Sequence, residues 1–356
     1  MGRRPLAALD ERGATRRPQR VSADAALRVA LDLDGSLESL GNSMTDLADA
    51  LVTSGGCELV RFRTLTSSRD GECRLAGRWL WAPWWRRSLG RPVDALLPAV
   101  DVIHVAGLAT PPTRSTPLVV SVDDLRPLRG ETRIVQRVAQ LHRAAAHGAI
   151  LVASTRTASH EVLEVLGARR SQVLVVPPAV PRVAPTVDGR DLVVNVTGLI
   201  DRFLVLAPAL ARFTSERGAR LVAVASSQAR QRVRASGLAV TLRGRDEARA
   251  ALGDARVVLH ISDGARFPSF AVAALSAGVP TIARSTRINR ELLEGAATLV
   301  TDDEGWLDNL RDVWSNESRR SIMIAAGAAR AVDFSPTTAA RAYAALYREV
   351  VRGWRA

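Results

Sequence analysis

The chain has 356 residues, enough for about two domains of ordinary size. Hydrophobic residues make up 47% of it and charged residues 24%, as in ordinary globular proteins, so wholesale disorder is excluded. The formal net charge is +13, and every basic side chain other than histidine is arginine. Because the sequence has no lysine, a Walker-type phosphate loop and a Schiff-base lysine are both excluded.

The same composition sets expectations about partners and compartment. Arginine is abundant together with alanine, valine and glycine, the bias of a GC-rich bacterial genome, so the charge is partly compositional and we expect no nucleic-acid partner. The sequence has no apolar run long enough to span a membrane, and its basic first residues are not followed by an apolar run, so we expect no secretory signal. Cys57 and Cys73 are too few for a disulfide framework or a cysteine zinc site. We therefore expect a cytoplasmic protein.

Residues 1–25 are rich in arginine without an apolar period, which predicts a flexible basic tail. From Leu27 onward, short β-branched runs alternate with helical patterns. In the first half, the predicted strands are 27–33, 58–62, 102–105, 118–122, 150–153 and 173–176. The predicted helices are 43–53, 133–147 and 158–166, and the last two each precede a glycine that suits a helix end.

The prolines between 177 and 185 interrupt this alternation and predict a linker. In the second half, the predicted strands are 192–196, 221–224, 240–242, 257–261, 281–283 and 297–300, and a last helix covers 337–351. Strands separated by helical crossovers indicate an α/β fold with parallel, doubly wound sheets. We expect an N-terminal Rossmann-like domain at 26–182, a C-terminal one at 183–335, a cleft between them, and a C-terminal helical segment, 336–356, that crosses back to the first domain.

Several segments, taken in order, resemble a known family. They are 117–128 (PLVVSVDDLRPL), 150–155 (ILVAST), 171–178 (SQVLVVPP), 277–281 (AGVPT), 290–295 (RELLEG), and FSP at 334–336 before a helix that ends in LYRE. Their order and spacing are similar to GT-B glycosyltransferases of the retaining, nucleotide-sugar-dependent group 1 / family 4 type, from about Leu27 to Val351. The resemblance implies an acceptor-side N-terminal domain, a donor-side C-terminal domain, a nucleotide-sugar substrate, and no metal or other cofactor.

The family's donor-side carboxylates are mostly replaced. The resemblance implies two glutamates, one that contacts the donor sugar and one that holds the nucleotide ribose, at the positions of Ala265 and Ala273. Asp263 lies two residues upstream and replaces the first of them if the loop is re-registered. Glu291 matches a family carboxylate near the donor nucleotide, although a simple helix-start placement explains it as well.

The family's phosphate-binding residues are also altered. Where the family has an Arg and a Lys after the first strand of the second domain, the loop here is shorter and contains Gly198 and Arg202. Gly41 and Asn42 precede one predicted helix and 265–269 precedes another, where backbone N–H groups attract phosphate, although the glycines could equally serve only the turns. The donor-binding candidates are therefore Gly41, Asn42, Gly198, Arg202, Asp263, Arg266, Phe267, Ser269 and Glu291.

Two further positions follow from the resemblance. The family's His-Asp pair after the strand 118–122 becomes Asp123-Asp124, which are the candidate catalytic residues. His104 keeps a family-like place at the end of its predicted strand.

Residues 78–87 hold four of the seven tryptophans, interleaved with arginine. Indoles beside guanidinium groups suit a membrane interface or an acceptor site, and packing into the domain core is the alternative. The candidate residues are Arg78, Trp79, Trp81, Trp84, Trp85 and Arg86.

The remaining patterns favour no other chemistry. Asp32-Leu-Asp34 spells the D-x-D of metal-dependent transferases, but it follows the first strand rather than lying late in a domain, so chance explains it better. His142, His147, His160 and His260 lack metal-ligand spacing, so we expect no metal site.

Three functions remain open. The first is a retaining glycosyltransferase that moves a sugar from a nucleotide sugar to a cell-envelope or lipid-linked glycan, at the inner face of the plasma membrane. The second is an inactive GT-B shell that binds a glycan or a partner transferase, which the loss of both glutamates favours. The third is a nucleotide-sugar epimerase, which would need acids and a histidine facing the cleft.

Overall fold

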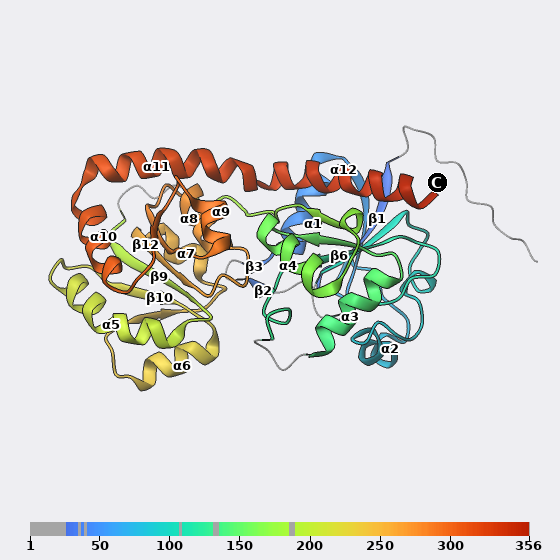
Figure 1. Cartoon of the computed structure of the whole chain (residues 1–356), viewed down its shortest axis with the longest axis horizontal. Helices are drawn as coiled ribbons and strands as arrows, with labels where there is room; N and C mark the ends of the chain where they lie inside the picture. Colours follow the sequence, from blue (N-terminus) through green and yellow to red (C-terminus); the bar gives the residue numbers. More distant parts are fainter. Residues whose placement is uncertain are drawn as a thin grey trace, which may run out of the picture.

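The structure is a computed structural model that describes residues 26–34, 37–38, 41–106, 109–130, 135–184 and 189–355. The predicted basic tail, residues 1–25, lies outside these residues. The chain forms two lobes, each built on a six-stranded sheet whose strands are all parallel. The first lobe lies on the right of Figure 1 and the second on the left.

In the first lobe, hereafter the N lobe, the sheet has the order β4-β1-β5-β6-β7-β8. Its strands are β1 (Leu27–Asp32), β4 (Cys57–Phe62), β5 (Val102–Ala106), β6 (Leu118–Val122), β7 (Ile150–Ala153) and β8 (Val173–Val175). Its helices are α1 (Ser43–Ser54), α2 (Arg78–Trp85), α3 (Val135–Ala146) and α4 (Arg156–Leu166), with short 3-10 turns at Val93–Ala95 and Arg170–Gln172. The two-residue strands β2 (Leu37–Glu38) and β3 (Gly41–Asn42) pair antiparallel before α1.

Local sequence explains these elements. The side chains of a strand alternate between the two faces of its sheet, so Val29 and Leu31 face α1 whereas Ala30 faces α3 and α4. Helix α4 begins at the N-cap Thr155, whose hydroxyl accepts a hydrogen bond from Ala158 N, and it ends at Gly167 with φ 59°.

In the second lobe, hereafter the C lobe, the sheet has the order β11-β10-β9-β12-β13-β14. Its strands are β9 (Asp191–Thr197), β10 (Leu221–Val224), β11 (Thr241–Arg243), β12 (Ala255–Ser262), β13 (Thr281–Arg284) and β14 (Thr298–Val300). Its helices are α5 (Ile200–Ser215), α6 (Ser227–Ala235), α7 (Ala248–Gly253), α8 (Ser269–Ser276), α9 (Arg287–Leu293), α10 (Glu304–Ser315) and α11 (Glu317–Ala331). Strand order reverses beside β9, as it does beside β1 in the N lobe, and ligands of open α/β sheets bind at the carboxyl ends of the strands near such reversals.

The last helix joins the lobes. After a 3-10 turn at Val332–Phe334, α12 (Pro336–Arg355) leaves the end of α11 and lies along the N lobe (Figure 1). Its buried face, which includes Tyr343 and Tyr347, packs against α1 and the sheet. None of the helices in the described residues combines the length and the apolar character needed to cross a bilayer.

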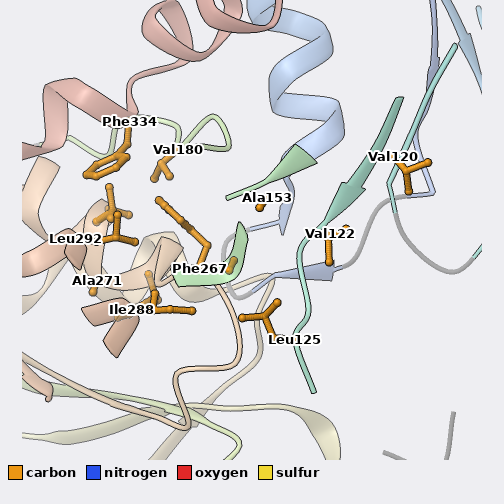
Figure 2. Packing of buried hydrophobic residues seen from close by; sticks show 14 of the residues in the cluster. Val120, Val122, Leu125, Ala153, Val180, Phe267, Ala271, Ile288, Leu292 and Phe334 are labelled. Atoms are coloured by element: carbon orange, nitrogen blue, oxygen red, sulfur yellow. The ribbon is translucent and has the colours of Figure 1, made fainter. Parts of the chain in front are cut away.

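One apolar cluster crosses the boundary between the lobes. Figure 2 shows Val122 and Leu125 of the N lobe in the same cluster as Phe267 and Phe334. The rings of Phe267 and Phe334 meet edge to face with centroids 5.4 Å apart, and Val180 N donates to Phe334 O at 2.9 Å. Along this part of the boundary the lobes are in direct contact, so the expected cleft does not extend through it.

Candidate functional site

A cavity of about 240 Å³ lies at the carboxyl ends of β9, β10 and β11, beside the lobe boundary. Four arginines line it, three from the C lobe and one, Arg126, from the loop after β6 of the N lobe. Its described lining residues are Arg126, Val196, Gly198, Ile200, Ser226, Gln228, Ala229, Arg232, Arg245 and Arg266. This lining contains no carboxylate and no histidine, so the cavity suits an anionic ligand.

The C-lobe loops that surround the cavity have well-defined local structure. Ser226 caps α6 through a hydrogen bond from Ala229 N to its Oγ. Gly198 follows β9 with φ 79°, and the Asp263 carboxylate occupies the place that a Cβ at this position would need. Asp263 also accepts a hydrogen bond from Ala265 N at 3.0 Å. Asp263 therefore supports the loop beneath the cavity, and Gly198 is required both for its φ and for this close approach.

Asp124 lies at the edge of the cavity between arginines of opposite lobes. It accepts hydrogen bonds from Arg126 Nε at 3.0 Å and from Arg266 Nη2 at 2.8 Å. Burial alone would raise the pKa of the Asp124 carboxyl, but the hydrogen bonds from Arg126 and the charge of Arg266 outweigh it and hold that pKa below its ordinary value. Asp124 is therefore an anchor for two cavity arginines and a poor proton acceptor.

The neighbouring Asp123 belongs to the same electrostatic network. Burial lowers the pKa of the Arg137 guanidinium to about 10, against the opposing attraction of the Asp123 and Asp124 carboxylates. Even so, Arg137 remains protonated at neutral pH, and it balances acidic charge beneath the loop after β6. The structure thus brings the two candidate catalytic residues together among arginines.

Arg202 and Glu291, two donor-side candidates, have partners outside the cavity. Arg202 lies on the first turn of α5 and donates to Asp303 Oδ1 at 2.7 Å. Glu291, on α9, crosses to the N lobe and accepts hydrogen bonds from Arg156 N at 2.7 Å and from Thr157 N at 2.8 Å. Burial opposes ionisation of Glu291, but the hydrogen bonds from Thr157 and Arg156 outweigh it, so the pKa of its carboxyl is lowered. Glu291 acts as an N-terminal cap of α4 supplied by the other lobe.

The residues of the donor-side loop before α8 lie in different environments, some at the cavity and some buried. Arg266 reaches the cavity, whereas the Phe267 ring is buried in the cluster between the lobes and Ser269 is buried at the start of α8. Ala265 and Ala273, at the positions of the family glutamates, are both fully buried. At Ala273 the helix packs too closely for a side chain to extend toward a ribose without displacing its neighbours.

On the N-lobe side, the remaining candidates have structural partners. Gly41 and Asn42 form the short strand β3 immediately before α1. Asp32 and Asp34 organise the loop after β4: Asp32 accepts from Thr64 Oγ1 at 2.7 Å, and Asp34 accepts from Thr66 N at 2.9 Å. The two aspartates of the D-x-D sequence therefore hold this loop in place through hydrogen bonds.

The tryptophan-rich segment contains both buried and exposed indoles. Trp85 is fully buried and donates to Arg91 O at 2.9 Å, and Trp81 is partly buried against the core. Trp79 and Trp84 expose 73% and 50% of their surface, respectively, on α2. Arg78 binds Leu65 O, and Arg86 is exposed. Some tryptophans of this segment therefore pack into the core of the N lobe, and others lie on its surface.

Among the described residues, neither the histidines nor any cluster of metal-binding side chains forms a second functional site. His104 lies inside β5 and is fully buried, rather than at the end of its strand. His260 is buried in β12 with its Nδ1 3.0 Å from Asn195 Nδ2, and burial lowers its pKa to about 4. Within the described ranges, no three His, Cys, Asp or Glu side chains gather in a way that could hold a metal ion.

Sequence reasoning missed Arg126, Arg232 and Arg245. In a chain with 49 arginines and no lysines, residue type alone gives no reason to single out three of them. For Arg126 and Arg245, the available signal was a position shortly after a predicted strand, where the carboxyl edge of the sheet gathers ligand-binding groups. Arg232, in the last turn of α6, had no such signal.

No protein-family model matches this chain, and no curated protein matches it either. Solved structures do match. Sucrose-phosphate synthase from Thermosynechococcus elongatus aligns over 92% of this chain and 100% of its own, with a TM-score of 0.65 and 14% identity. WaaG, a glycosyltransferase involved in lipopolysaccharide biosynthesis, aligns over 90% and 99%, with a TM-score of 0.61 and 13% identity. Anabaena HepE, solved in complex with UDP-glucose, aligns over 91% and 100%, with a TM-score of 0.61 and 15% identity. The predicted GT-B fold, with two Rossmann-like lobes, is confirmed.

Proposed function

We propose that this protein is a nucleotide-sugar-dependent glycosyltransferase that binds the diphosphate of its donor in the arginine-lined cavity. The supporting observation is the gathering of Arg126, Arg232, Arg245 and Arg266 around one cavity at the carboxyl edge of the C-lobe sheet. Guanidinium groups bind phosphate oxygens in a planar, two-pronged geometry. HepE, which has the same fold, is solved with UDP-glucose, and this is consistent with such a ligand here.

The arginines would also assist the chemical step. When the bond between the sugar and the diphosphate breaks, negative charge grows on the leaving phosphate, and fixed positive charge near it lowers the barrier. Arg266 follows β12 and Arg126 follows β6, so the two lobes both supply charge to one site. In this proposal the arginines replace the basic pair that the family places after the first strand of its donor domain, and the reaction proceeds with retention and without a metal.

The acceptor is proposed from the surface of α2. Trp79, Leu80 and Trp84 are exposed on this helix, and exposed arginines flank it. Such a surface suits the headgroup region of an anionic membrane, where indoles sit among headgroups and guanidinium groups meet phosphate. We propose a lipid-linked or cell-envelope glycan as the acceptor, at the inner face of the plasma membrane.

Calorimetry with UDP, GDP, ADP and UDP-glucose on the full chain tests the donor site. We expect one nucleotide to bind, and Arg266→Ala to weaken its binding roughly 10- to 100-fold, because a hydrogen bond to a charged group contributes about 1.5–3 kcal/mol. Arg202→Ala is the matched control: Arg202 does not line the cavity and donates to Asp303 outside it, so its loss should leave binding unchanged. If none of these nucleotides, nor a wider panel of bases, binds the unmutated protein, the proposed function is wrong.

A second candidate is a shell that binds a nucleotide sugar, a glycan or a partner transferase without turnover. Buried alanines at both family glutamate positions and the use of Glu291 as a cap of α4 favour it. Binding without release of free nucleotide in the presence of lipid-linked acceptors would select this candidate over the transferase. The epimerase has less support, because the described cavity lining provides neither an acid nor a histidine.

A further inference from the structure

Asp124 is one of the residues through which the two lobes share a charged contact, and it is the one that binds arginines of the cavity. Its carboxylate binds Arg126, two residues further along its own loop, and Arg266, which belongs to the loop after β12 of the other lobe. The contact continues into the backbone, where Leu125 N donates to Ala265 O at 2.9 Å. Arg129 extends it further, with Nη2 3.2 Å from Gly264 O.

Electrostatics explains why a carboxylate is needed there. Two guanidinium groups that contact the same carboxylate are close enough to repel each other, and the charge of Asp124 offsets that repulsion. Each of these side chains is at most about 30% exposed, so solvent screens the charges less than it would at an open surface. Without the carboxylate, the two arginines and the loops that carry them would move apart.

We propose that Asp124 is a positioning residue that holds Arg126 and Arg266 side by side across the lobe boundary, so that the anion cavity is already assembled before a ligand binds. The inference uses the cavity described under the proposed function, but it requires only that the cavity binds an anion. It requires neither a particular nucleotide nor sugar transfer. In the ligand-free protein, Asp124 supplies the negative charge between these two arginines. A bound diphosphate adds a second anion beside the same guanidinium groups.

Glu291 provides an internal comparison. It also bridges the lobes through a carboxylate, because its oxygens accept hydrogen bonds from Arg156 N, Thr157 N and Thr157 Oγ1. Glu291 does not line the cavity and does not bind a cavity arginine. An added anion can therefore replace the charge of Asp124 but not the hydrogen bonds that Glu291 accepts.

Hydrogen exchange of backbone amides in the full chain tests this inference, because both bridges contain reporter amides. In Asp124→Asn, we expect the amide of Leu125 to exchange at least about tenfold faster, as follows from the loss of a charge-assisted contact. Inorganic pyrophosphate should restore much of its protection by placing negative charge between Arg126 and Arg266. In Glu291→Gln, the amides of Arg156 and Thr157 should exchange faster, and pyrophosphate should not restore them.

Two controls isolate the role of the charge. Asp303→Asn removes an Asp–Arg pair of the same kind within the C lobe, and it should leave Leu125 protected. Asp124→Glu keeps the charge and should retain most of the protection, which keeps the test usable if Asp124→Asn folds poorly.

Two results would overturn the inference. The first is unchanged protection of Leu125 in Asp124→Asn, and the second is lost protection that pyrophosphate does not restore, which would make Asp124 a structural bridge only. If pyrophosphate restores Leu125 but no nucleotide binds the unmutated protein, Asp124 keeps its positioning role and the proposed function is wrong.

Discussion

The Nδ1 atom of His104, inside β5, lies 2.7 Å from the hydroxyl of Tyr347 on the C-terminal helix α12. The other ring nitrogen lies 2.8 Å from Ser121 Oγ on β6, and the Tyr343 ring stacks on the imidazole with centroids 5.4 Å apart. All of these polar atoms are buried. His104 therefore joins the sheet of the N lobe to the last helix of the chain, through a contact between residues 243 positions apart. It is fully buried and is not a cleft residue.

Removal of the Tyr347 hydroxyl should destabilise the protein. In Tyr347→Phe, a buried ring nitrogen of His104 loses its partner, which costs about 1–3 kcal/mol of unfolding free energy. Urea denaturation at pH 8 measures this value. A double-mutant cycle with His104→Leu should show coupling between the two positions, and additive effects would contradict the contact.

The Asp32 carboxyl should make stability depend on pH. Burial and the nearby charge of Asp34 raise the pKa of Asp32 from 3.8 to about 7. The folded state thus holds a proton that the unfolded chain releases near pH 4, so the stabilising contribution of Asp32 is present below about pH 4 and is lost as the pH rises through 7.

Asp32→Asn removes this dependence, because an amide can accept from Thr64 N without ionising. Relative to the unmutated protein, the variant should gain stability as the pH rises from 4 to 7 and show a constant difference above that range. Denaturation midpoints across this pH range measure the effect. A stability difference that does not vary with pH would show that Asp32 is not the titrating group.

The exposed indoles of α2 should carry any membrane binding. Replacement of Trp79 and Trp84 by serine should reduce co-sedimentation with anionic vesicles several-fold without loss of fold, because both side chains already lie at least half in solvent. Val205→Ser, a change at an equally exposed apolar residue on α5, should have no effect. If the unmutated protein does not sediment with anionic vesicles, α2 is not a membrane contact.

Trp85 behaves differently from its neighbours. Because its side chain is fully buried, Trp85→Ser should cost about 3–5 kcal/mol and unfold part of the protein, so it cannot serve in the vesicle experiment.

A glutamate introduced at position 273, where the family has its second glutamate, should destabilise the protein. Ala273→Glu places an ionised group in a fully buried position of α8, and it should lower the unfolding free energy by several kcal/mol. Ala328→Glu, on the exposed surface of α11, should change it by less than about 0.5 kcal/mol. Thermal unfolding compares the two variants. Equal melting temperatures would mean that the packing around α8 adapts to a carboxylate.

The alternation of apolar runs and helical patterns predicted most of the elements. The strands at 118–122, 150–153 and 221–224 have the bounds that the sequence indicated. Helix α2 was not predicted, since Pro83 and four tryptophans within ten residues do not form a helical pattern. The hairpin of β2 and β3 was missed as well, because two-residue strands have no period to detect.

For the candidate site as well, some residues could be predicted from the sequence and others could not. The sequence indicated Gly198 and Arg266, which line the cavity, whereas the place of Arg126 in the cavity depends on the contact between the loop after β6 and the loop after β12. Glu291 kept the position of a donor-side acid, and its hydrogen bonds to Arg156 and Thr157 depend on how the lobes meet.

Hydrophobic periodicity and the order of turn residues are local properties, and they were sufficient to determine two parallel α/β lobes. The partner of each charged side chain is not a local property, because arginines placed similarly along the chain can point toward a cavity, a carboxylate or solvent. Only the packing of the lobes decided that Asp124, Arg126 and Arg266 meet, since contacts between residues more than a hundred positions apart depend on the whole tertiary structure.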